Sequence, residues 1–320
     1  MRAIHVRQHG GPEVLVLADL PSPKPGPGEV LVDVAAAGVN YIDTYHRSGQ
    51  YHVKPPFVLG NEGAGTVRAL GEGVTGVKVN DRVAWTGVLG SYAEQAVVPA
   101  HKLVPLPSGV SEELAAASLL QGATAHYLVK STYEIQPGDW ALVHAAAGGV
   151  GLLLTQMVKL CGGHVLATVS TPEKAELARQ AGADEVASYD EFVNRARELT
   201  GGEGFPVVYD GVGRSTFDGS LDALRPRGMM VLYGASSGQV PPLDLQLLNT
   251  KGSLYVTRPT LAHYTRDRDE LLDRVGEVFS WIGTGLLSVR IGGRYPLTHA
   301  RRAHEDLHSR RTTGKLVLVP

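Results

Sequence analysis

The chain has 320 residues, of which 43% are apolar, and its formal net charge at pH 7 is −2. This length allows two domains of ordinary size with a large core. The near-neutral charge argues against nucleic acid or an anionic membrane surface as the main partner. A single cysteine excludes an intrachain disulfide framework and any multi-cysteine zinc site. No signal peptide and no apolar run of membrane-spanning length is evident, so we expect a cytoplasmic protein.

The first 120 residues are rich in glycine, proline and short strand-like runs. Strands are expected at 29–34, 64–70 and 81–85, each bounded by glycine-containing turns. The local composition changes at Ser111-Glu112-Glu113. These residues predict the start of a helix, which continues as an apolar helix over 115–120. We therefore expect a mostly β domain over residues 1–120.

Strands and helices alternate from residue 121 to 258. Expected strands lie at 140–145, 164–169, 183–187, 207–210 and 229–233, and expected helices at 149–161, 172–182, 190–200 and 215–224. Ser170-Thr171-Pro172-Glu173 predicts a capping box with proline near the helix start. This alternation predicts an α/β class domain, a doubly wound parallel sheet with helices on both faces.

The last part of the chain, residues 259–320, is predicted to return to the first domain. An edge strand is expected just before it, at 251–256. Helices are expected near 267–283 and 300–309, and a final strand at 315–319. The nucleotide-type domain over 121–258 is then inserted between the two parts of a domain formed by 1–120 and 259–320.

A glycine-rich turn follows the apolar strand at 140–143. It reads His144-Ala145-Ala146-Ala147-Gly148-Gly149-Val150-Gly151, with small residues at the A-x-x-G-x-x-G spacing of a dinucleotide fingerprint. Gly148 lets the backbone approach a pyrophosphate, and Gly151 lets the helix pack tightly on its strand. The helix N-terminus offers free N–H groups to phosphates. The segment predicts a nicotinamide or flavin dinucleotide site, since the strand and helix around the turn have the required order.

The residues after the next strand bear on which dinucleotide is bound. An acidic residue at this strand end would hold the ribose hydroxyls of NAD. The strand at 164–169 instead ends in Ser170-Thr171, with Lys174 one turn into the following helix. Hydroxyls and a cation suit a 2′-phosphate, so the sequence favours NADP(H), although Lys174 could equally be a solvated helix charge.

Several further segments make the whole chain resemble a known family. They are His9-Gly10-Gly11-Pro12-Glu13-Val14-Leu15, Gly38 to Tyr45, Arg47-Ser48-Gly49, Gly60-Asn61-Glu62, Val208-Tyr209-Asp210 and Lys251 to Pro259. With the glycine-rich turn, they resemble the zinc-independent quinone oxidoreductases of the medium-chain dehydrogenase/reductase superfamily, a group that includes zeta-crystallin. The resemblance implies a GroES-like catalytic domain and a Rossmann domain. It also implies a homodimer, in which the edge strand at 251–256 would pair across the interface.

The positions that carry zinc ligands in alcohol dehydrogenases differ in this chain. Those enzymes have a cysteine and a Gly-His-Glu motif where this sequence has Asn40 and Gly60-Asn61-Glu62. Asparagine is a poor zinc ligand. We therefore expect no catalytic metal, which favours a substrate that needs little activation, such as a quinone.

The resemblance also implies which residues line the site. Asn40, Tyr45 and Tyr51 are the expected catalytic and quinone-pocket residues, with Tyr51 also consistent with a core or interface aromatic. The expected NADPH contacts are Asn40, Tyr41, Ile42, Asp43, Thr44, Tyr45, Tyr127, Gly148, Gly149, Val150, Gly151, Ser170, Thr171, Lys174, Tyr189, Ser236, Ser237, Gly238, Thr257, Arg258 and Arg310.

The expected reaction is direct hydride transfer from NADPH to a quinone, with Asn40 and Tyr45 donating hydrogen bonds to the developing oxyanion. Two alternatives remain open: reduction of α,β-unsaturated carbonyls, and a non-enzymatic crystallin-like role that binds NADPH or RNA. The near-neutral charge makes nucleic acid an unfavoured partner. His304-Glu305-Asp306-Leu307-His308 matches the H-E-x-x-H zinc motif, but no third ligand follows it, so we expect a chance match.

Overall fold

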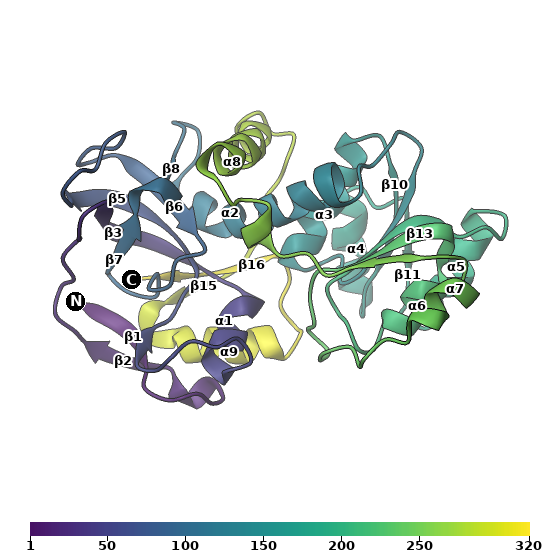
Figure 1. Cartoon of the computed structure of the whole chain (residues 1–320), viewed down its shortest axis with the longest axis horizontal. Coiled ribbons are helices and arrows are strands. Elements are labelled where there is room, and N and C mark those ends of the chain that lie inside the picture. The colour runs from purple at the N-terminus through teal and green to yellow at the C-terminus, as the bar shows by residue number, and fades with distance from the viewer. The chain divides into compact units, whose positions relative to one another are not determined.

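The computed structural model describes all 320 residues. The chain packs into two compact units, Met1–Leu120 with Asp267–Pro320, and Gln121–Arg266. Figure 1 labels their elements. The domain limits expected from the sequence, 120/121 and 258/259, remain a prediction. No helix in the structure is both long and apolar enough to cross a membrane.

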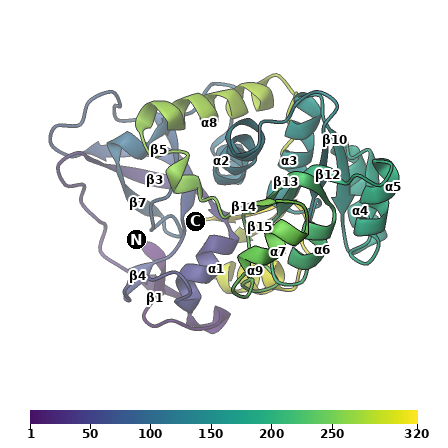
Figure 2. The same cartoon turned by 45° about the vertical axis from the view of Figure 1, so that its right-hand side comes forward.

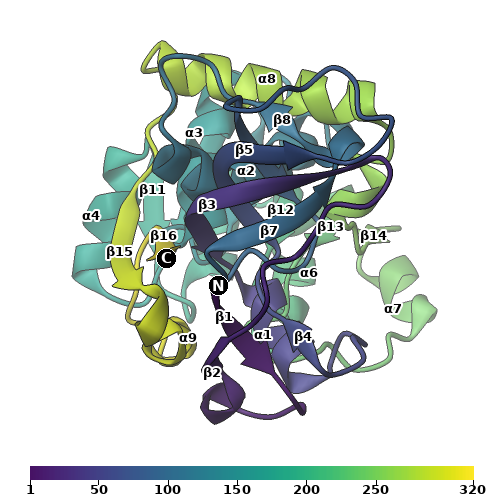
Figure 3. The same ribbon diagram turned by 90° about the vertical axis from the view of Figure 1, so that its left-hand side faces the viewer.

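The first unit is built around a seven-stranded sheet in the order β15-β16-β3-β5-β6-β8, with β7 also paired to β3. Figure 3 shows β3 flanked by β5 and β7. A second, three-stranded sheet has the order β2-β1-β4. The strands are β1 Arg2–Val6, β2 Val16–Asp19, β3 Glu29–Val39, β4 Phe57–Val58, β5 Glu62–Leu70, β6 Arg82–Thr86, β7 Gln95–Pro99, β8 Val104–Pro105, β15 Ile291–Pro296 and β16 Lys315–Val319.

The helices of this unit position the segments that matter below. They are α1 Tyr41–Ser48, α8 Arg268–Gly283 and α9 Ala300–His308, with the first half of α2 Glu112–Tyr127. Helix α1 follows β3 directly, and β16 pairs antiparallel with the end of β3, Leu316 opposite Val39. This pairing brings the last strand of the chain next to the start of α1. Helix α9 buries Ala300, Ala303 and His304 in the unit.

The second unit is a six-stranded parallel sheet in the order β11-β10-β9-β12-β13-β14. Its strands are β9 Trp140–Val143, β10 His164–Thr168, β11 Glu185–Ala187, β12 Phe205–Asp210, β13 Leu224–Leu232 and β14 Tyr255–Thr257. The helices are α3 Gly149–Leu160, α4 Pro172–Gln180, α5 Phe192–Leu199, α6 Phe217–Asp222 and α7 Leu245–Thr250. Figure 2 shows α3 and α6 on opposite sides of the strands. The chain leaves β9 toward β10 and later returns to its other side as β12, which creates a topological switch point.

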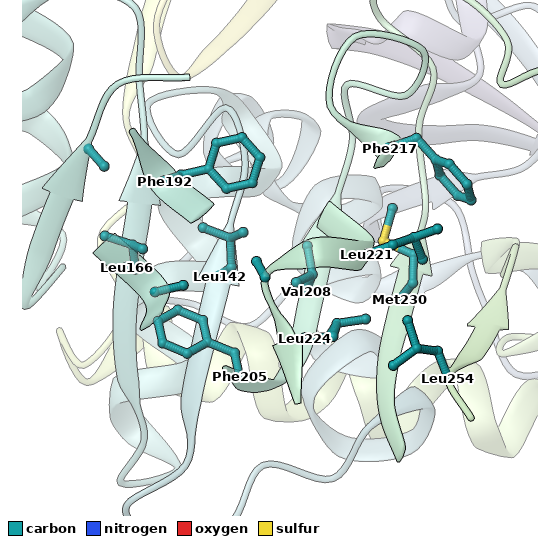
Figure 4. Close-up of a cluster of buried hydrophobic side chains, with 13 residues drawn as sticks. Leu142, Leu166, Phe192, Phe205, Val208, Phe217, Leu221, Leu224, Met230 and Leu254 are labelled. Carbon is teal, nitrogen blue, oxygen red and sulfur yellow. The ribbon is translucent and has the colours of Figure 1, made fainter. Parts of the chain in front are cut away.

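The core of the second unit explains why these strands read as nearly continuous apolar runs. Leu142, Leu166, Val208 and Met230 lie on the strands and pack with Phe192 and other side chains from α5 and α6. Figure 4 shows this cluster, in which the aromatic rings lie beside the strand side chains. Burying both sheet faces fixes the strand ends, and the strand ends carry the loops described below.

The predicted fold class is confirmed: a parallel doubly wound sheet occurs together with a mostly β unit. Three local expectations need correction. The edge strand begins at Tyr255 rather than at 251, because Ser253 has a positive φ of 56° and Leu254 turns into the core. Helix α1, which the sequence analysis did not predict, occupies 41–48. The cap of α4 is Thr171, whose hydroxyl accepts from the Lys174 N–H.

Candidate active site

The glycine-rich turn joins β9 to α3 at the switch point. Ala145 takes the first small-residue position with a positive φ of 50°, and the Gly148 N–H closes the turn onto the Ala145 carbonyl at 2.9 Å. A Cβ at Gly151 would lie 2.4 Å from the Ala145 carbonyl oxygen and 2.7 Å from Ala146 Cα. Gly151 is therefore needed for helix α3 to approach its strand, as the fingerprint predicts.

The N-terminus of α3 is open to an anion. Its cap residue is Gly148, which has no side chain to accept a hydrogen bond from the first turn. The free N–H groups of Gly149, Val150 and Gly151 and the positive end of the helix dipole therefore lie at the same place. This donor set fits a pyrophosphate.

A buried polar network lies beneath this turn. The Asp210 carboxylate, at the end of β12, accepts from the N–H groups of Val212 and Gly213 and from the hydroxyls of Thr216 and Ser220. Ser220 also contacts His144 Nε2 at 2.9 Å, and the other ring nitrogen of His144 contacts Thr168 Oγ1 at 2.7 Å. Burial lowers the pKa of the His144 imidazole. We call Asp210, Thr216, Ser220, His144 and Thr168 the Asp210 network.

The loop after β12 holds the loop after β13. Ser237 Oγ donates to the Val212 carbonyl at 2.8 Å and accepts from the Ser215 N–H at 3.1 Å. The Ser236 N–H donates to the Gly211 carbonyl, and the Arg214 N–H to the Gly238 carbonyl. The predicted cofactor contacts Ser236, Ser237 and Gly238 thus lie beside the switch point, but the hydroxyl of Ser237 already has partners within the protein.

The end of β10 carries the group predicted to select the cofactor. Lys174 Nζ donates to Ser170 Oγ at 3.3 Å, and both residues lie at the exposed start of α4. Thr171 is committed to its cap, since its hydroxyl accepts from the Lys174 N–H and bonds to the Glu173 carboxylate. Ser170 and Lys174 therefore fit a 2′-phosphate better than Thr171 does. Tyr189, on the neighbouring strand end, accepts a hydrogen bond from the Ala145 N–H and stacks on His144.

Two further predicted contacts of this unit are already engaged within it. Tyr127 is buried and stacks on Tyr264, with parallel rings whose centroids are 4.2 Å apart. Burial raises the pKa of the Tyr127 hydroxyl, and the nearby Arg258 opposes that shift. Arg258 follows Thr257, the last residue of β14.

The remaining predicted residues belong to the other unit, and most of them lie on α1 or just beside it. Tyr45 and Tyr51 lie together, with ring centroids 5.2 Å apart, and Tyr51 is 39% exposed. Ile42 and Tyr45 are half-buried, whereas Asp43 and Thr44 are buried. Asp43 and Thr44 thus point into the protein and cannot offer their side chains to a cofactor. The prediction that their side chains bind NADPH therefore needs correction, and a contact through their backbone stays a prediction.

Asn40 is held by charged groups. Its Oδ1 accepts from Lys315 Nζ at 2.6 Å, and its Nδ2 donates to Glu62 Oε2 at 2.8 Å and to the Gly38 carbonyl at 3.3 Å. Lys315 Nζ also contacts Glu62 Oε2 at 2.5 Å, and both side chains are at most 1% exposed. We call Asn40, Glu62 and Lys315 the Lys315 triad. Both amide hydrogens of Asn40 have acceptors, so Asn40 does not have a free donor for an oxyanion, contrary to the sequence prediction.

A second buried chain of polar groups supports α1 from below. Arg47 Nη1 contacts His304 Nδ1 at 3.1 Å, His304 Nε2 contacts the Tyr92 hydroxyl at 3.2 Å, and that hydroxyl donates to Asp43 Oδ2 at 3.0 Å. A guanidinium only donates, so His304 is neutral with its proton on Nε2. Burial and the Arg47 charge lower the pKa of His304 to about 3. We call these four residues the Asp43 relay.

Burial also raises the pKa of Asp43 to about 7, although the Asn40 N–H, Tyr92 and Lys315 oppose the shift. The other carboxylate oxygen of Asp43, Oδ1, is buried without a partner. His304, the first histidine of the H-E-x-x-H match, is wholly buried in this relay, so it does not face a metal. No group of three potential metal-ligating side chains occurs in the structure.

Tyr41 and Arg310 complete the predicted set. The Tyr41 hydroxyl donates to the Leu307 carbonyl at 3.2 Å, and its ring stacks on His308. Burial raises the pKa of Tyr41, and the Arg310 charge lowers it, which places Arg310 near this ring. The predicted residues thus form two groups, one in each unit.

Two residues that contact predicted site residues, Lys315 and Gln121, are not recognisable from the sequence. Lys315 lies in the strand predicted at 315–319, where nothing in the sequence sets it apart. Gln121 has a buried Oε1 without a partner, and a Cβ at Gly149 would lie 2.1 Å from that oxygen. Neither residue lies in a recognisable motif. Each acts through a partner distant in sequence, so no local pattern could have identified it.

Comparison with known proteins extends over the whole chain. Residues 149–275 match the family described as zinc-binding dehydrogenase, and residues 26–108 match the alcohol dehydrogenase GroES-like domain. The quinone oxidoreductase of Pseudomonas aeruginosa is 48% identical, covering 100% of this chain and 99% of the relative. A 2-haloacrylate reductase of a Burkholderia species is 39% identical, covering 98% of each.

Solved structures agree with this similarity. Mycobacterial Rv1454c in complex with NADPH is 51% identical, with a TM-score of 0.98 and complete coverage of both chains. The quinone oxidoreductase of Escherichia coli in complex with NADPH is 46% identical, with a TM-score of 0.98 and the same coverage.

Proposed function

This chain belongs to the quinone oxidoreductase family of the medium-chain dehydrogenase/reductase superfamily, and we propose that it reduces a quinone with NADPH. The similarity to quinone oxidoreductases over the full length supports the reaction. The feature of this structure that carries the cofactor choice is the Lys174–Ser170 pair at the end of β10, where an NAD enzyme would carry an acid.

The residues present fit NADPH. The three free N–H groups at the start of α3 would hold the pyrophosphate, and Ser170 with Lys174 would hold the 2′-phosphate. Tyr189 would lie beside the adenosine ribose, and Tyr127, Thr257 and Arg258 would approach the nicotinamide half. Bound NADPH supplies a hydride.

The protein's own residues orient the reactants and exclude water. Tyr45 and Tyr51 would line the quinone pocket, and the Tyr45 hydroxyl would donate a hydrogen bond to the quinone oxygen that gains charge. Asn40 would shape the pocket without donating to that oxygen, since both of its amide hydrogens have acceptors. A solvent proton would complete the hydroquinone.

The first experiment mixes purified, metal-free protein with NADPH and a small para-quinone and follows the loss of nicotinamide absorbance, with NADH in parallel. We expect rapid loss with NADPH and little with NADH. Equal rates with the two cofactors would contradict the role of Lys174. NADPH that binds without being consumed would contradict quinone reduction. A Tyr45→Phe variant should turn over more slowly, and unchanged turnover would remove Tyr45 from the mechanism.

Reduction of an activated carbon–carbon double bond is the second candidate. It is favoured by the similarity to the 2-haloacrylate reductase, because a pocket that delivers hydride to a quinone carbonyl system can also deliver it to the β-carbon of an unsaturated acid or carbonyl. Turnover of a para-quinone, an alkenal and a 2-haloacrylate side by side separates the two. We expect the quinone to be the better substrate.

We also propose a cytoplasmic homodimer that pairs through the edge of the nucleotide-type sheet. β14 ends that sheet, and Tyr255 on it is 59% exposed. An open strand edge offers unpaired backbone groups to a second copy. A Tyr255→Lys variant that stays dimeric in sedimentation would argue against this edge.

A further inference from the structure

Lys315 is a buried charge whose position the proposed function does not yet explain. It begins β16, its side chain is 1% exposed, and its ammonium contacts two side chains only, Asn40 and Glu62. Burying an ammonium is costly unless it is paired and hydrogen-bonded. A fold that needed only stability could have used an apolar side chain here, so the charge calls for a role.

The three side chains of the Lys315 triad all contact one another, and their hydrogen bonds can run in only one direction. Lys315 can only donate and the Glu62 carboxylate can only accept, so Asn40 must present Oδ1 to the lysine and Nδ2 to the glutamate. Glu62 is itself fixed, because its second oxygen accepts from the Leu120 N–H at 2.7 Å. The amide of Asn40 therefore has one orientation and cannot flip while Lys315 is present.

Asn40 in turn fixes the start of α1. It is the residue before the helix, its N–H donates to Asp43 Oδ2 at 2.8 Å, and its carbonyl accepts from the Asp43 N–H at 3.1 Å. The same helix carries Tyr45, the proposed hydrogen-bond donor to the quinone. The chain of contacts thus runs from the last strand, through one amide, to the residue that faces the substrate.

We propose that Lys315 is a positioning residue of the reductase, whose ammonium fixes the Asn40 amide and thereby the first turn of α1. In zinc-dependent alcohol dehydrogenases, the positions of Asn40 and Glu62 belong to the metal-site motifs described above. Here an internal ammonium bridges those two positions. This inference rests on the proposed function, because Tyr45 acts on the quinone only if the protein is a reductase.

The test removes the ammonium without leaving a buried charge. Lys315→Met alone would leave the Glu62 carboxylate buried without a cation. The main variant therefore combines Lys315→Met with Glu62→Gln, so that both side chains are neutral. Without the ammonium, the Asn40 amide can turn its oxygen toward Gln at position 62. We expect kcat with the quinone to fall about 10-fold, comparable to the loss seen when a residue that orients a metal ligand is removed. The dissociation constant for NADPH should change less than about 3-fold, since its phosphate contacts lie elsewhere.

Two measurements separate positioning from general damage. Adding Asn40→Leu to the double variant should cost no further activity, because both changes act through the same amide. In wild-type protein, the side-chain amide hydrogens of Asn40 should be protected from exchange in nuclear magnetic resonance spectra, and the double variant should lose that protection. Lys159→Met is the control, since it removes an exposed lysine paired with Asp184, and it should change neither quantity.

Several results would overturn the inference. One is an unchanged kcat in the folded double variant. Another is a further loss of kcat on adding Asn40→Leu that equals the loss caused by Asn40→Leu alone. The third is unaltered protection of the Asn40 amide hydrogens in the double variant. A wild-type protein that does not consume NADPH with any quinone would instead contradict the proposed function. The exchange measurement would still decide whether Lys315 fixes Asn40.

Discussion

The two units support their predicted site residues by different physical means. Beneath the glycine-rich turn, the Asp210 carboxylate gathers backbone N–H groups and hydroxyls, and no second charge pairs with it. Beneath α1, two buried carboxylates, Asp43 and Glu62, lie with two cations, Arg47 and Lys315. The first arrangement shapes a backbone that can bind phosphate. The second fixes the start of α1, which carries the proposed substrate-facing side chains, and its charges make it sensitive to pH and to substitution.

The largest predicted effect tests the charged arrangement through pH. Asp43 has a raised pKa of about 7 in the folded protein against 3.8 for an ordinary aspartate. Between these values the folded state holds a proton that the unfolded state has lost, so stability falls as pH rises from about 4 to 7. At about 1.36 kcal/mol per pKa unit, the fall is on the order of 4 kcal/mol.

His304 contributes with the opposite sign. Its pKa falls from 6.5 to about 3 on folding. Between these values the unfolded state binds a proton that the folded state does not, so stability falls as pH drops below 6.5. Relative to wild type, Asp43→Asn should therefore gain stability as pH rises from about 4 to 8, and His304→Gln should gain it as pH falls from about 7 to 4. Urea unfolding across this range checks both. Curves parallel to wild type for both variants would show that the relay does not control stability.

The second prediction tests the backbone arrangement. In Gly151→Ala, the new Cβ would meet the Ala145 carbonyl oxygen and Ala146 Cα, both backbone atoms, so α3 must move off its strand. We expect the free energy of unfolding to fall by about 3 kcal/mol, the upper end for overpacking. We also expect the variant to lose NADPH binding. Gly276→Ala in α8 is the matched control. A Cβ added at Gly276 would meet no neighbouring atom, and the position lies inside helix α8. The variant should therefore gain about 0.5–1 kcal/mol in the free energy of unfolding. Equal behaviour of the two variants in urea unfolding would refute the packing argument.

The same contrast explains what the sequence could reveal. Gly151 was identified because the strand, the turn and the helix are contiguous, so their spacing is visible in eight residues. Lys315 was missed because its partners, Asn40 and Glu62, lie 275 and 253 positions away. Helix α1 is not predictable from its pattern, because its buried Asp43 and Arg47 break the apolar periodicity expected of a buried face. A motif predicts a local backbone, whereas a buried charge pair depends on the completed fold.

The third prediction concerns cofactor selection in the backbone-supported unit. Lys174→Ala removes the cation beside Ser170 at the end of β10. The pair is exposed, so we expect NADPH affinity to fall about 10-fold, at the lower end for a charged hydrogen bond, while NADH affinity stays the same. Arg179→Ala, near the opposite end of α4, is the control and should change neither affinity. Titration of the wild-type protein and both variants with NADPH and with NADH gives the six dissociation constants. A parallel loss of NADPH and NADH affinity would show that Lys174 does not read the 2′-phosphate.

The smallest predicted effect asks whether a side chain also matters at the glycine-rich turn. Gly149→Ala would place a Cβ 2.1 Å from Gln121 Oε1 and 2.4 Å from its Nε2, so the clash is with a flexible side chain rather than with backbone. Gln121 can turn away, and we expect a cost of only about 1 kcal/mol, at the low end for overpacking. In a Gln121→Ala background the same substitution should cost almost nothing, because the obstructing amide is gone. A double-mutant cycle on unfolding free energy measures this coupling directly. A coupling energy near zero would mean that backbone geometry alone, and not the Gln121 side chain, requires glycine at position 149. The predicted site residues of this unit would then depend on backbone, in clearer contrast to the buried side-chain charges beneath α1.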